Sequence, residues 1–200
     1  MRLRASLMEN ALVYRLWQAP FAERKLAPFF AHNDVRALRR VLDVGCGPGT
    51  NTGHFKHTDY VGVDINPQYI ESARQRHHRT FVVADITTTP DLGSRFDCVF
   101  INSFLHHVSD PDAHNILAHL EPRVTDDGYV HALELVLPTQ PSPALLLARL
   151  DRGHYARPLA SWQALFERHF EPVVFEPYPL GAFGVTLWEM VYFKGRARSR

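Results

Sequence analysis

The sequence feature that most constrains the fold is a short apolar run that ends in three closely spaced glycines. Val41–Val44 is followed by Gly45, Gly47 and Gly49. Without a Cβ, glycine lets the backbone turn sharply and approach a ligand closely. Such a loop, when it leads into a helix, presents amide N–H groups to an anionic group. The pattern predicts a strand, a tight turn and then a helix start, with a binding site at the turn.

Further apolar runs of strand length alternate with segments of helical spacing. This alternation predicts a parallel sheet covered by helices on both faces, and thus a doubly wound α/β fold. A turn at Asp126, Asp127 and Gly128 is expected to introduce the fifth strand. The expected strands after the first are Tyr60–Ile65, Thr80–Ala84, Asp97–Ile101 and Tyr129–Leu135, and the expected helices run from Pro67 to about Arg76 and from Asp110 to Leu120.

The two ends of the chain are expected to add to this core. Residues 1–36 contain amphipathic segments broken near Pro20 and predict an N-terminal helical cap. Residues 136–170 predict an insertion on the substrate side. Pro172–Glu176 and Thr186–Phe193 predict two strands that close the sheet as an antiparallel hairpin, and residues 195–200 predict a disordered basic tail. At 200 residues, a single domain is expected.

The charge balance and the two cysteines exclude several classes of function. Lys and Arg total 22 against 21 for Asp and Glu, so no overall positive field draws the chain to nucleic acid. Cys46 and Cys98 lie in apolar stretches, which argues against a disulfide framework and fits a reducing cytoplasm. No apolar stretch has the length of a signal peptide core or a membrane span. We expect a soluble cytoplasmic protein without a nucleic acid or membrane partner, and leave the oligomeric state open.

Acidic residues end the second and third expected strands. Asp64 follows the glycine loop by about twenty residues, where a carboxylate can accept hydrogen bonds from both hydroxyls of a ribose. Asp85 is placed to meet the adenine end of a nucleoside. The carboxyl ends of parallel strands border one crevice, so a nucleoside site is expected there.

These residues resemble the class I S-adenosylmethionine-dependent methyltransferases, in particular the small-molecule branch. The resemblance covers roughly Arg39 to Glu134 and is carried by Val41–Thr50, Val61–Asp64, Ala84–Ile86 and Phe96–Val108. It implies S-adenosylmethionine as the cofactor and a three-layer αβα fold whose seven-stranded, mostly parallel sheet has an antiparallel last strand. It also implies the cofactor-binding residues, which are Tyr14, Asp43, Gly45, Cys46, Gly47, Gly49, Asp64, Ile65, Asp85, Ile86, Asn102 and Ser103.

Two of these residues have particular expected roles. Asp43 would lie near the amino group of the cofactor, above glycines that support its methionine part. Tyr14, with its neighbour Trp17, could attract the sulfonium by about 0.5 to 2 kcal/mol through a cation–π contact, although aromatic residues of this kind are more often part of the core.

The candidate catalytic residues follow the fourth strand and end the fifth. Methyl transfer needs alignment of the acceptor and exclusion of water, and it needs a base only when the acceptor arrives protonated. His106 and His107 are the candidate bases, with a structural contact to the cofactor as the alternative. Glu134 either orients a hydroxyl or amine of the acceptor or simply ends its strand.

The segment from Arg149 to Arg157 holds several polar side chains whose role is open. It forms either a solvated face or a wall of the pocket, and the second case would suit a substrate with an acidic or hydroxylated group. The polar residues are Arg149, Asp151, Arg152, His154, Tyr155 and Arg157.

Other readings of the motifs fit less well. A nicotinamide dehydrogenase needs glycine where this chain has Thr50, and a nucleic-acid amino-methyltransferase typically has Pro-Pro after Asn102 rather than Ser103 and Phe104. The pairs His77–His78 and His106–His107 lack supporting ligands, so no metal is expected. Two alternatives stay open: an enzyme that binds the same cofactor for cyclisation or decarboxylation, and a non-catalytic binding protein.

Overall fold

A single sheet of seven strands organises the described part of the chain. The computed structural model describes residues 21–88, 92–93, 95–151 and 153–198. The strand order is β3-β2-β1-β4-β5-β7-β6, and all neighbours are parallel except those of β7, which runs antiparallel to both β5 and β6. The strands are β1 (Arg40–Val44), β2 (Asp59–Asp64), β3 (Thr80–Val83), β4 (Phe96–Asn102), β5 (Val124–Val136), β6 (Phe170–Ala182) and β7 (Val185–Ala197).

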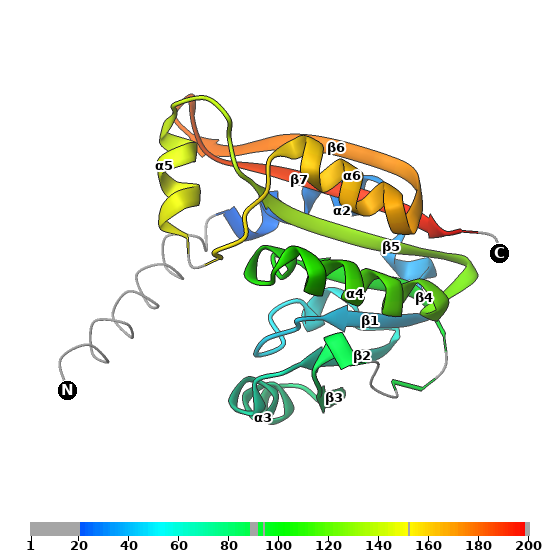
Figure 1. Ribbon diagram of the computed structural model, residues 1–200. Helices are drawn as coiled ribbons and strands as arrows, with labels where there is room; N and C mark the ends of the chain where they lie inside the picture. Colours follow the sequence, from blue (N-terminus) through cyan, green and yellow to red (C-terminus); the bar gives the residue numbers. More distant parts are fainter. Residues whose placement is uncertain (1–20, 89–91, 94, 152, 199–200) are drawn as a thin grey trace.

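Helices cover both faces of this sheet (Figure 1). On one face, Leu26 and Phe29 of α2 and Ile70 of α3 pack with the sheet in one core cluster. On the other face, α4 and α6 pack together in a second cluster. The three-layer αβα prediction is therefore confirmed. The helices are α2 (Ala22–Ala31), α3 (Pro67–Arg76), α4 (Asp110–Leu120), α5 (Pro143–Leu150) and α6 (Leu159–His169), with short 3-10 turns η2 (Val35–Ala37), η3 (Thr52–His54), η4 (Ile86–Thr88), η5 (Leu105–His107) and η6 (Glu121–Arg123).

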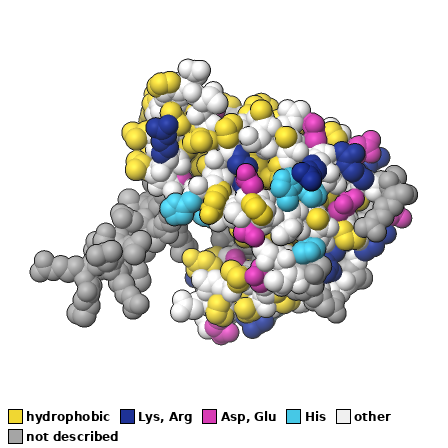
Figure 2. All heavy atoms as spheres, in the orientation of Figure 1, with side chains coloured by type: hydrophobic (Ala, Val, Ile, Leu, Met, Phe, Trp, Pro, Cys, Tyr) yellow, Lys and Arg dark blue, Asp and Glu magenta, His cyan; other side chains and the backbone are white. Residues whose placement is uncertain are grey.

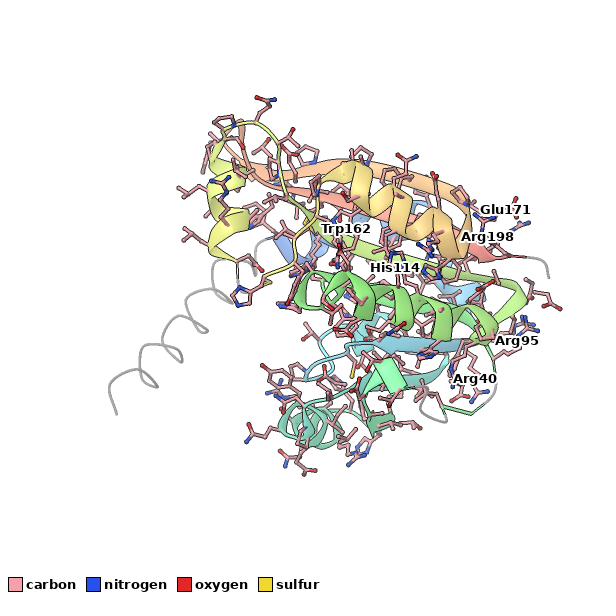
Figure 3. All side chains as sticks on the ribbon, in the orientation of Figure 1. Arg40, Arg95, His114, Trp162, Glu171 and Arg198 are labelled. Carbon is pink, nitrogen blue, oxygen red and sulfur yellow. The ribbon has the colours of Figure 1, made fainter. Side chains whose placement is uncertain are left out.

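Helix α6 makes specific contacts with the sheet and with α4. Trp162 of α6 is fully buried and donates its indole N–H to the Leu135 carbonyl of β5 at 2.9 Å. His114 of α4 meets His169 of α6, with 2.9 Å between their ring nitrogens; His114 and Trp162 are labelled in Figure 3. The Trp162 contact places the start of α6 at the carboxyl end of β5, and the histidine contact joins the end of α6 to α4.

The helix expected after the glycine loop is wrong. Residues 45–58 join β1 to β2, and their only helical element is the three-residue turn η3. The glycine loop uses the first part of this connection, and the rest must return to the amino end of the sheet, so no room is left for a full α-helix. The loop therefore offers its own amide groups but no helix N-terminus.

The terminal hairpin is longer than the sequence predicted. The residues expected to form a loop continue β6 as far as Ala182, and only Phe183 and Gly184 turn the chain, both with positive φ. Such a two-residue turn matches the twist of a hairpin. Prolines 172, 177 and 179 are tolerated within β6 because it is the edge strand, where backbone N–H groups are not all needed for pairing.

The prediction of a disordered tail is wrong for most of its residues. Gly195–Ala197 belongs to β7 and pairs with β6, with Phe170 opposite Ala197. A Cβ on Gly195 would lie 2.5 Å from the ring of Phe193, so the glycine lets the strand pass close to that ring. Arg198 then donates to the Glu167 carbonyl of α6. Pairing and packing thus order the tail through residue 198.

The expected turn before the fifth strand lies inside β5. Phe96 pairs with Val124 and Cys98 pairs with Tyr129, so residues 125–128 bulge opposite Asp97. A Cβ on Gly128 would meet the Asp97 backbone at 2.9 Å, which explains glycine at this position. The bulge extends β5 toward its amino end without changing its pairing further along.

The described residues include two buried cysteines and an exposed apolar area. Both cysteines are free and buried. Within the described residues, no helix has the length and apolar character needed to cross a membrane. Hydrophobic side chains gather over α5 and the tip of the β6–β7 hairpin (Figure 2). The exposed apolar residues there are Leu146, Leu150, Phe183 and Val185.

Candidate active site

The glycine loop lies at the carboxyl end of β1. The amides of Gly45 and Cys46 both donate to the Val63 carbonyl of β2, at 2.9 and 3.1 Å, which ties the loop to the neighbouring strand. All three glycines have positive φ. A Cβ on Gly45 would strike the Phe104 ring at 2.5 Å, whereas a Cβ on Gly47 would meet no atom within 4 Å. Gly45 thus allows close packing, while Gly47 borders open space.

A buried polar network lies directly beneath the loop. Asp43 is fully buried and accepts hydrogen bonds from the Tyr60 hydroxyl at 2.7 Å and from the Asn51 amide at 3.5 Å. Asn102 at the end of β4 donates to Asn51 at 3.1 Å. Burial raises the pKa of Asp43 to about 7, although both hydrogen bonds oppose the shift. One oxygen each of Asp43 and Asn102 is buried without a hydrogen-bond partner among the described residues. Two such acceptors invite a ligand that carries N–H donors.

The acidic residues at the ends of β2 and β3 lie beside this network. The Asp64 carboxylate accepts hydrogen bonds from the backbone N–H groups of Gly47 at 2.9 Å and of Asn66 at 2.8 Å, which fix it in place at the loop. Asp85 accepts both the amide and the hydroxyl of Thr87, which hold the pKa of its carboxyl below the usual range. Ile65 next to Asp64 is 64% exposed and presents an apolar surface at the same edge.

The loop after β4 contains a strained residue. Ser103 has a φ of 53°, in the left-handed region that a side chain other than glycine or asparagine rarely adopts. Its amide donates to the Leu133 carbonyl of β5 at 2.8 Å, which holds it there. Strain of this kind persists only where the surroundings enforce it, and it is concentrated at functional sites.

Glu134 holds the same loop from β5. The carboxylate is fully buried and accepts the amides of Phe104 and Leu105 at 3.0 and 2.7 Å. Its second oxygen lies 2.7 Å from Nδ1 of His106. Burial opposes ionisation of Glu134, but the hydrogen bond and charge of His106 and the two amides hold its pKa below the usual value. Glu134 is therefore an anion that orders the loop.

His106 is enclosed between two carboxylates. Its Nε2 faces Asp151 at 3.5 Å, on the opposite side of the ring from Glu134. Burial disfavours the charged ring, but hydrogen bonds to Asp151 and Glu134, with their charges, outweigh it and raise the pKa of His106 to about 9. His106 is thus an imidazolium at neutral pH, with both ring nitrogens engaged.

His107 differs from its neighbour in its surroundings. It is exposed, and its ring centroid lies 4.2 Å from that of His106. Desolvation and the neighbouring His106 cation lower the pKa of His107, which keeps its ring neutral at pH 7. Of the two candidate bases, His107 is the one whose ring is accessible and uncharged.

Two of the expected cofactor residues, Cys46 and Ile86, do not present side chains at this edge, and a third lies outside the described residues. The Cys46 thiol is buried in a core cluster, and burial raises its pKa well above the usual range. Ile86 is buried in the other core cluster. Tyr14, like Trp17, lies outside the described residues. The remaining expected residues all lie at the carboxyl edge of β1, β2, β3 or β4.

Known proteins are similar to this chain over the residues that form this edge. Residues 41–128, which contain the glycine loop, Asp64, Asp85 and the loop after β4, match the family model described as a methyltransferase domain. Over these residues, which make up less than half of the chain, the sequence is similar to a methyltransferase domain. Its fold agrees: the N-methyltransferase NodS from Bradyrhizobium japonicum, in complex with S-adenosyl-L-homocysteine, superposes with a TM-score of 0.71 at 14% identity, covering 90% of this chain and 89% of that one.

Two curated relatives are also methyltransferases. Trans-aconitate 2-methyltransferase from Methylobacterium radiotolerans is 34% identical over 93 residues, which cover 44% of this chain and 35% of the relative. The enzyme of the same name from Variovorax paradoxus is 28% identical over 160 residues, or 76% of this chain and 60% of the relative. The chain thus spans less than two thirds of the length of these relatives.

The candidate site contains residues that the sequence motifs did not indicate. Tyr60 and Asn51 complete the network around Asp43. In the sequence alone, Tyr60 looks like any aromatic residue of a strand, and Asn51 looks like any polar residue of a turn. Asp151 and Arg157 belong to a segment that the sequence left open between a solvated face and a pocket wall. Their side chains are 5% and 7% exposed, so both are part of the interior.

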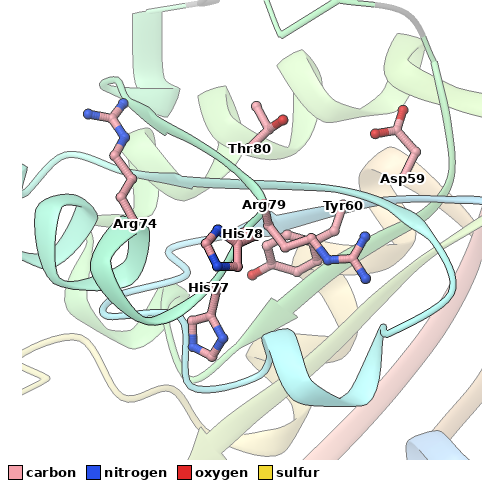
Figure 4. A pocket seen from close by; sticks show the side chains of 7 residues that line it. All are labelled: Asp59, Tyr60, Arg74, His77, His78, Arg79 and Thr80. Atoms are coloured by element: carbon pink, nitrogen blue, oxygen red, sulfur yellow. The ribbon is translucent and has the colours of Figure 1, made fainter.

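One cavity lies away from the candidate site. It has a volume of about 470 Å³ and lies where β2 and β3 begin and α3 ends, opposite the carboxyl ends of the strands (Figure 4). Its cations lie near the C-terminal end of α3, where positive charge complements the helix dipole. We do not assign the cofactor to this cavity. Its lining residues are Asp59, Tyr60, Arg74, His77, His78, Arg79 and Thr80.

Proposed function

We propose that this protein transfers the methyl group of S-adenosylmethionine to an O, N or C atom of a small molecule. The observation that carries the proposal is the pair of unpartnered buried oxygens, on Asp43 and Asn102, beneath a glycine loop that borders open space. These acceptors match the ammonium group of an amino acid, which the cofactor carries. A match to the methyltransferase domain over the same residues supports it.

The other residues of this edge bind the ribose, adenine and methionine parts of the cofactor. The Asp64 carboxylate, fixed by the amides of Gly47 and Asn66, accepts the ribose hydroxyls. Ile65 packs its exposed side chain against the adenine, and Asp85 lies at the adenine end. Gly47 lets the backbone pass under the methionine part, since a Cβ there would occupy the open space.

The protein residues supply alignment and proton handling. When bound, S-adenosylmethionine supplies a methyl group on a sulfonium, whose carbon–sulfur bond breaks as the acceptor bonds to the carbon. His107 accepts the proton of an acceptor that arrives protonated, because its ring is exposed and neutral. His106 and Glu134 act by holding the loop that carries His107, since both are buried and bonded to each other.

The small-molecule acceptor and the cytoplasmic location belong to this proposal. Both relatives above are named for trans-aconitate, a small molecule, although their sequences extend well beyond the matched region. The two free, buried cysteines fit a reducing compartment. The near balance of 22 basic and 21 acidic residues argues against a nucleic acid acceptor.

A labelling experiment tests the proposal. The protein is incubated with S-adenosylmethionine carrying a labelled methyl group and with a small-molecule extract, and both label and S-adenosylhomocysteine are followed. We expect label in a new small molecule together with an equal amount of S-adenosylhomocysteine. Consumption of the cofactor without label transfer would favour the alternative, a cyclising or decarboxylating enzyme. A protein that neither consumes the cofactor nor binds it would refute both.

A further inference from the structure

The connection between α5 and α6 grips the loop after β4 at several points. Asp151 lies against the His106 ring, and the Tyr155 amide donates to the His106 carbonyl at 3.0 Å. Gly153 lies so close that a Cβ would come within 2.0 Å of the His106 ring. Any other residue at 153 would push the two segments apart.

Arg157 forms the second part of this grip. Its guanidinium donates to the carbonyls of Leu105 and Val108, at 2.9 and 3.0 Å, and to the Asp110 carboxylate at 2.7 Å. The planar group also lies 4.7 Å above the Trp162 ring. Five N–H donors in a fixed plane suit several acceptors at once, which lysine cannot match. Arg157 thus holds the carbonyl side of the turn η5, while Glu134 holds its amide side.

We infer that Asp151 and Arg157 are positioning residues, which clamp the loop after β4 in the shape that the proposed methyl transfer requires. Asp151 acts through His106, and Arg157 acts through the carbonyls on either side of the histidine pair. The inference rests on the proposed function. It assigns the connection between α5 and α6 to the active site as a wall that fixes His107 rather than as a surface loop.

The charges around His106 make the clamp dependent on pH. Glu134 from β5, Asp151 from the connection and His107 from the same loop face this ring, and Lys25 of α2 interacts with the same two carboxylates. Burial lowers the pKa of Lys25 to about 8, although the negative charges of Glu134 and Asp151 oppose this shift. The pKa of His106 in the folded protein lies above its usual 6.5. The stabilising interaction of the charged ring with Asp151 is therefore fully present below pH 6.5 and is lost as the pH rises through about 9.

Asp151→Asn tests the clamp through His106, with Asp126→Asn as its matched control. Asp126 forms an exposed ion pair with Arg95 far from the site. We follow the His106 ring by NMR in the unliganded protein, assigned by its loss in His106→Gln. Removing one of two flanking carboxylates should lower the His106 pKa by about one unit or more, and Asp126→Asn should leave it unchanged. An unchanged His106 pKa in Asp151→Asn would overturn the inference.

Rates and affinities separate positioning from simple loss of structure. In Asp151→Asn, the initial rate of label transfer into the extract at saturating cofactor should fall about tenfold or more, while the affinity for S-adenosylhomocysteine stays within about threefold. The high-pH decline of this rate should also move to lower pH by the shift seen in the NMR titration. Arg157→Lys, which keeps the charge, should lower the rate in the same way and decides the matter if Asp151→Asn does not fold.

The two proposals fail in different ways. If the wild type transfers no label, the proposed function is wrong, whatever His106 does. If the wild type transfers label and both Asp151→Asn and Arg157→Lys do so at the wild-type rate, the proposed function stands and the clamp is wrong.

Discussion

At the scale of single residues, Gly47 is the position where the backbone and the expected ligand compete for space. Its φ is positive, and nothing lies within 4 Å of where a Cβ would be. Gly184 at the tip of the β6–β7 hairpin has the same two properties but lies in a turn between strands. The pair therefore separates the cost of backbone strain from the cost of a blocked site.

Gly47→Ala and Gly184→Ala should destabilise the protein equally but differ in binding. A left-handed alanine costs roughly 1 to 2 kcal/mol, so both variants should lose about that much unfolding free energy in urea. Only Gly47→Ala should bind S-adenosylhomocysteine at least tenfold more weakly by calorimetry, because its methyl group enters the ligand space. Equal affinity in the two variants would show that the ligand does not pass over Gly47.

The sequence could predict the residues whose role depends on backbone position, but not those whose role depends on long-range contacts. The positions of Gly47 and Asp64 relative to strand ends indicate them as candidates, whereas Asp43 is indicated by the family resemblance, and all three roles stay predictions. Arg157 was left undecided, because its burial results from the packing of the α5–α6 connection on the loop after β4. A sequence pattern contains no record of that packing.

At the scale of elements, the β6–β7 hairpin has an unusual turn. Phe183 and Gly184 both have positive φ, which suits asparagine and glycine in a two-residue hairpin but strains phenylalanine. The Phe183 side chain is fully exposed, so it gains nothing from packing. Among the described residues, no packing of the Phe183 ring therefore compensates for this backbone strain.

Phe183→Asn should stabilise the protein by about 0.5 to 1 kcal/mol, because asparagine adopts the left-handed conformation at less cost. The midpoint of urea unfolding should rise while the dependence on urea stays the same. A lower midpoint would mean that the Phe183 ring makes a contact that the exposed position does not indicate.

Elements were predictable where hydrophobic patterns are local. The helix at Asp110–Leu120 was predicted with its observed bounds because Ser109 caps it and Ala113, Ile116 and Leu117 mark its buried face. The extension of β6 through its prolines was not predictable, because prolines are tolerated there only on an edge strand. The prediction of a helix after Gly49 was wrong because the connection between β1 and β2 is too short to hold one.

At the scale of the whole molecule, the sheet order explains why one edge collects the chemistry. The carboxyl ends of β1, β2, β3 and β4 lie side by side, and β5 brings Glu134 next to them. The α5–α6 connection then crosses back over this edge and contacts His106. We propose that the chain acts as one domain, because all seven strands share one sheet.

We propose that this edge binds S-adenosylmethionine through Asp64 and its neighbours, and calorimetric titration with S-adenosylhomocysteine is the decisive measurement. We expect saturable binding of one ligand per chain in the wild type. Asp64→Asn should weaken binding about tenfold or more, since a hydrogen bond to a charged group contributes about 1.5 to 3 kcal/mol. Asp59→Asn, which removes an exposed ion pair with Arg40 at the other end of β2, should bind like the wild type. A folded wild type that shows no saturable binding, or an Asp64→Asn variant with unchanged affinity, would contradict the account.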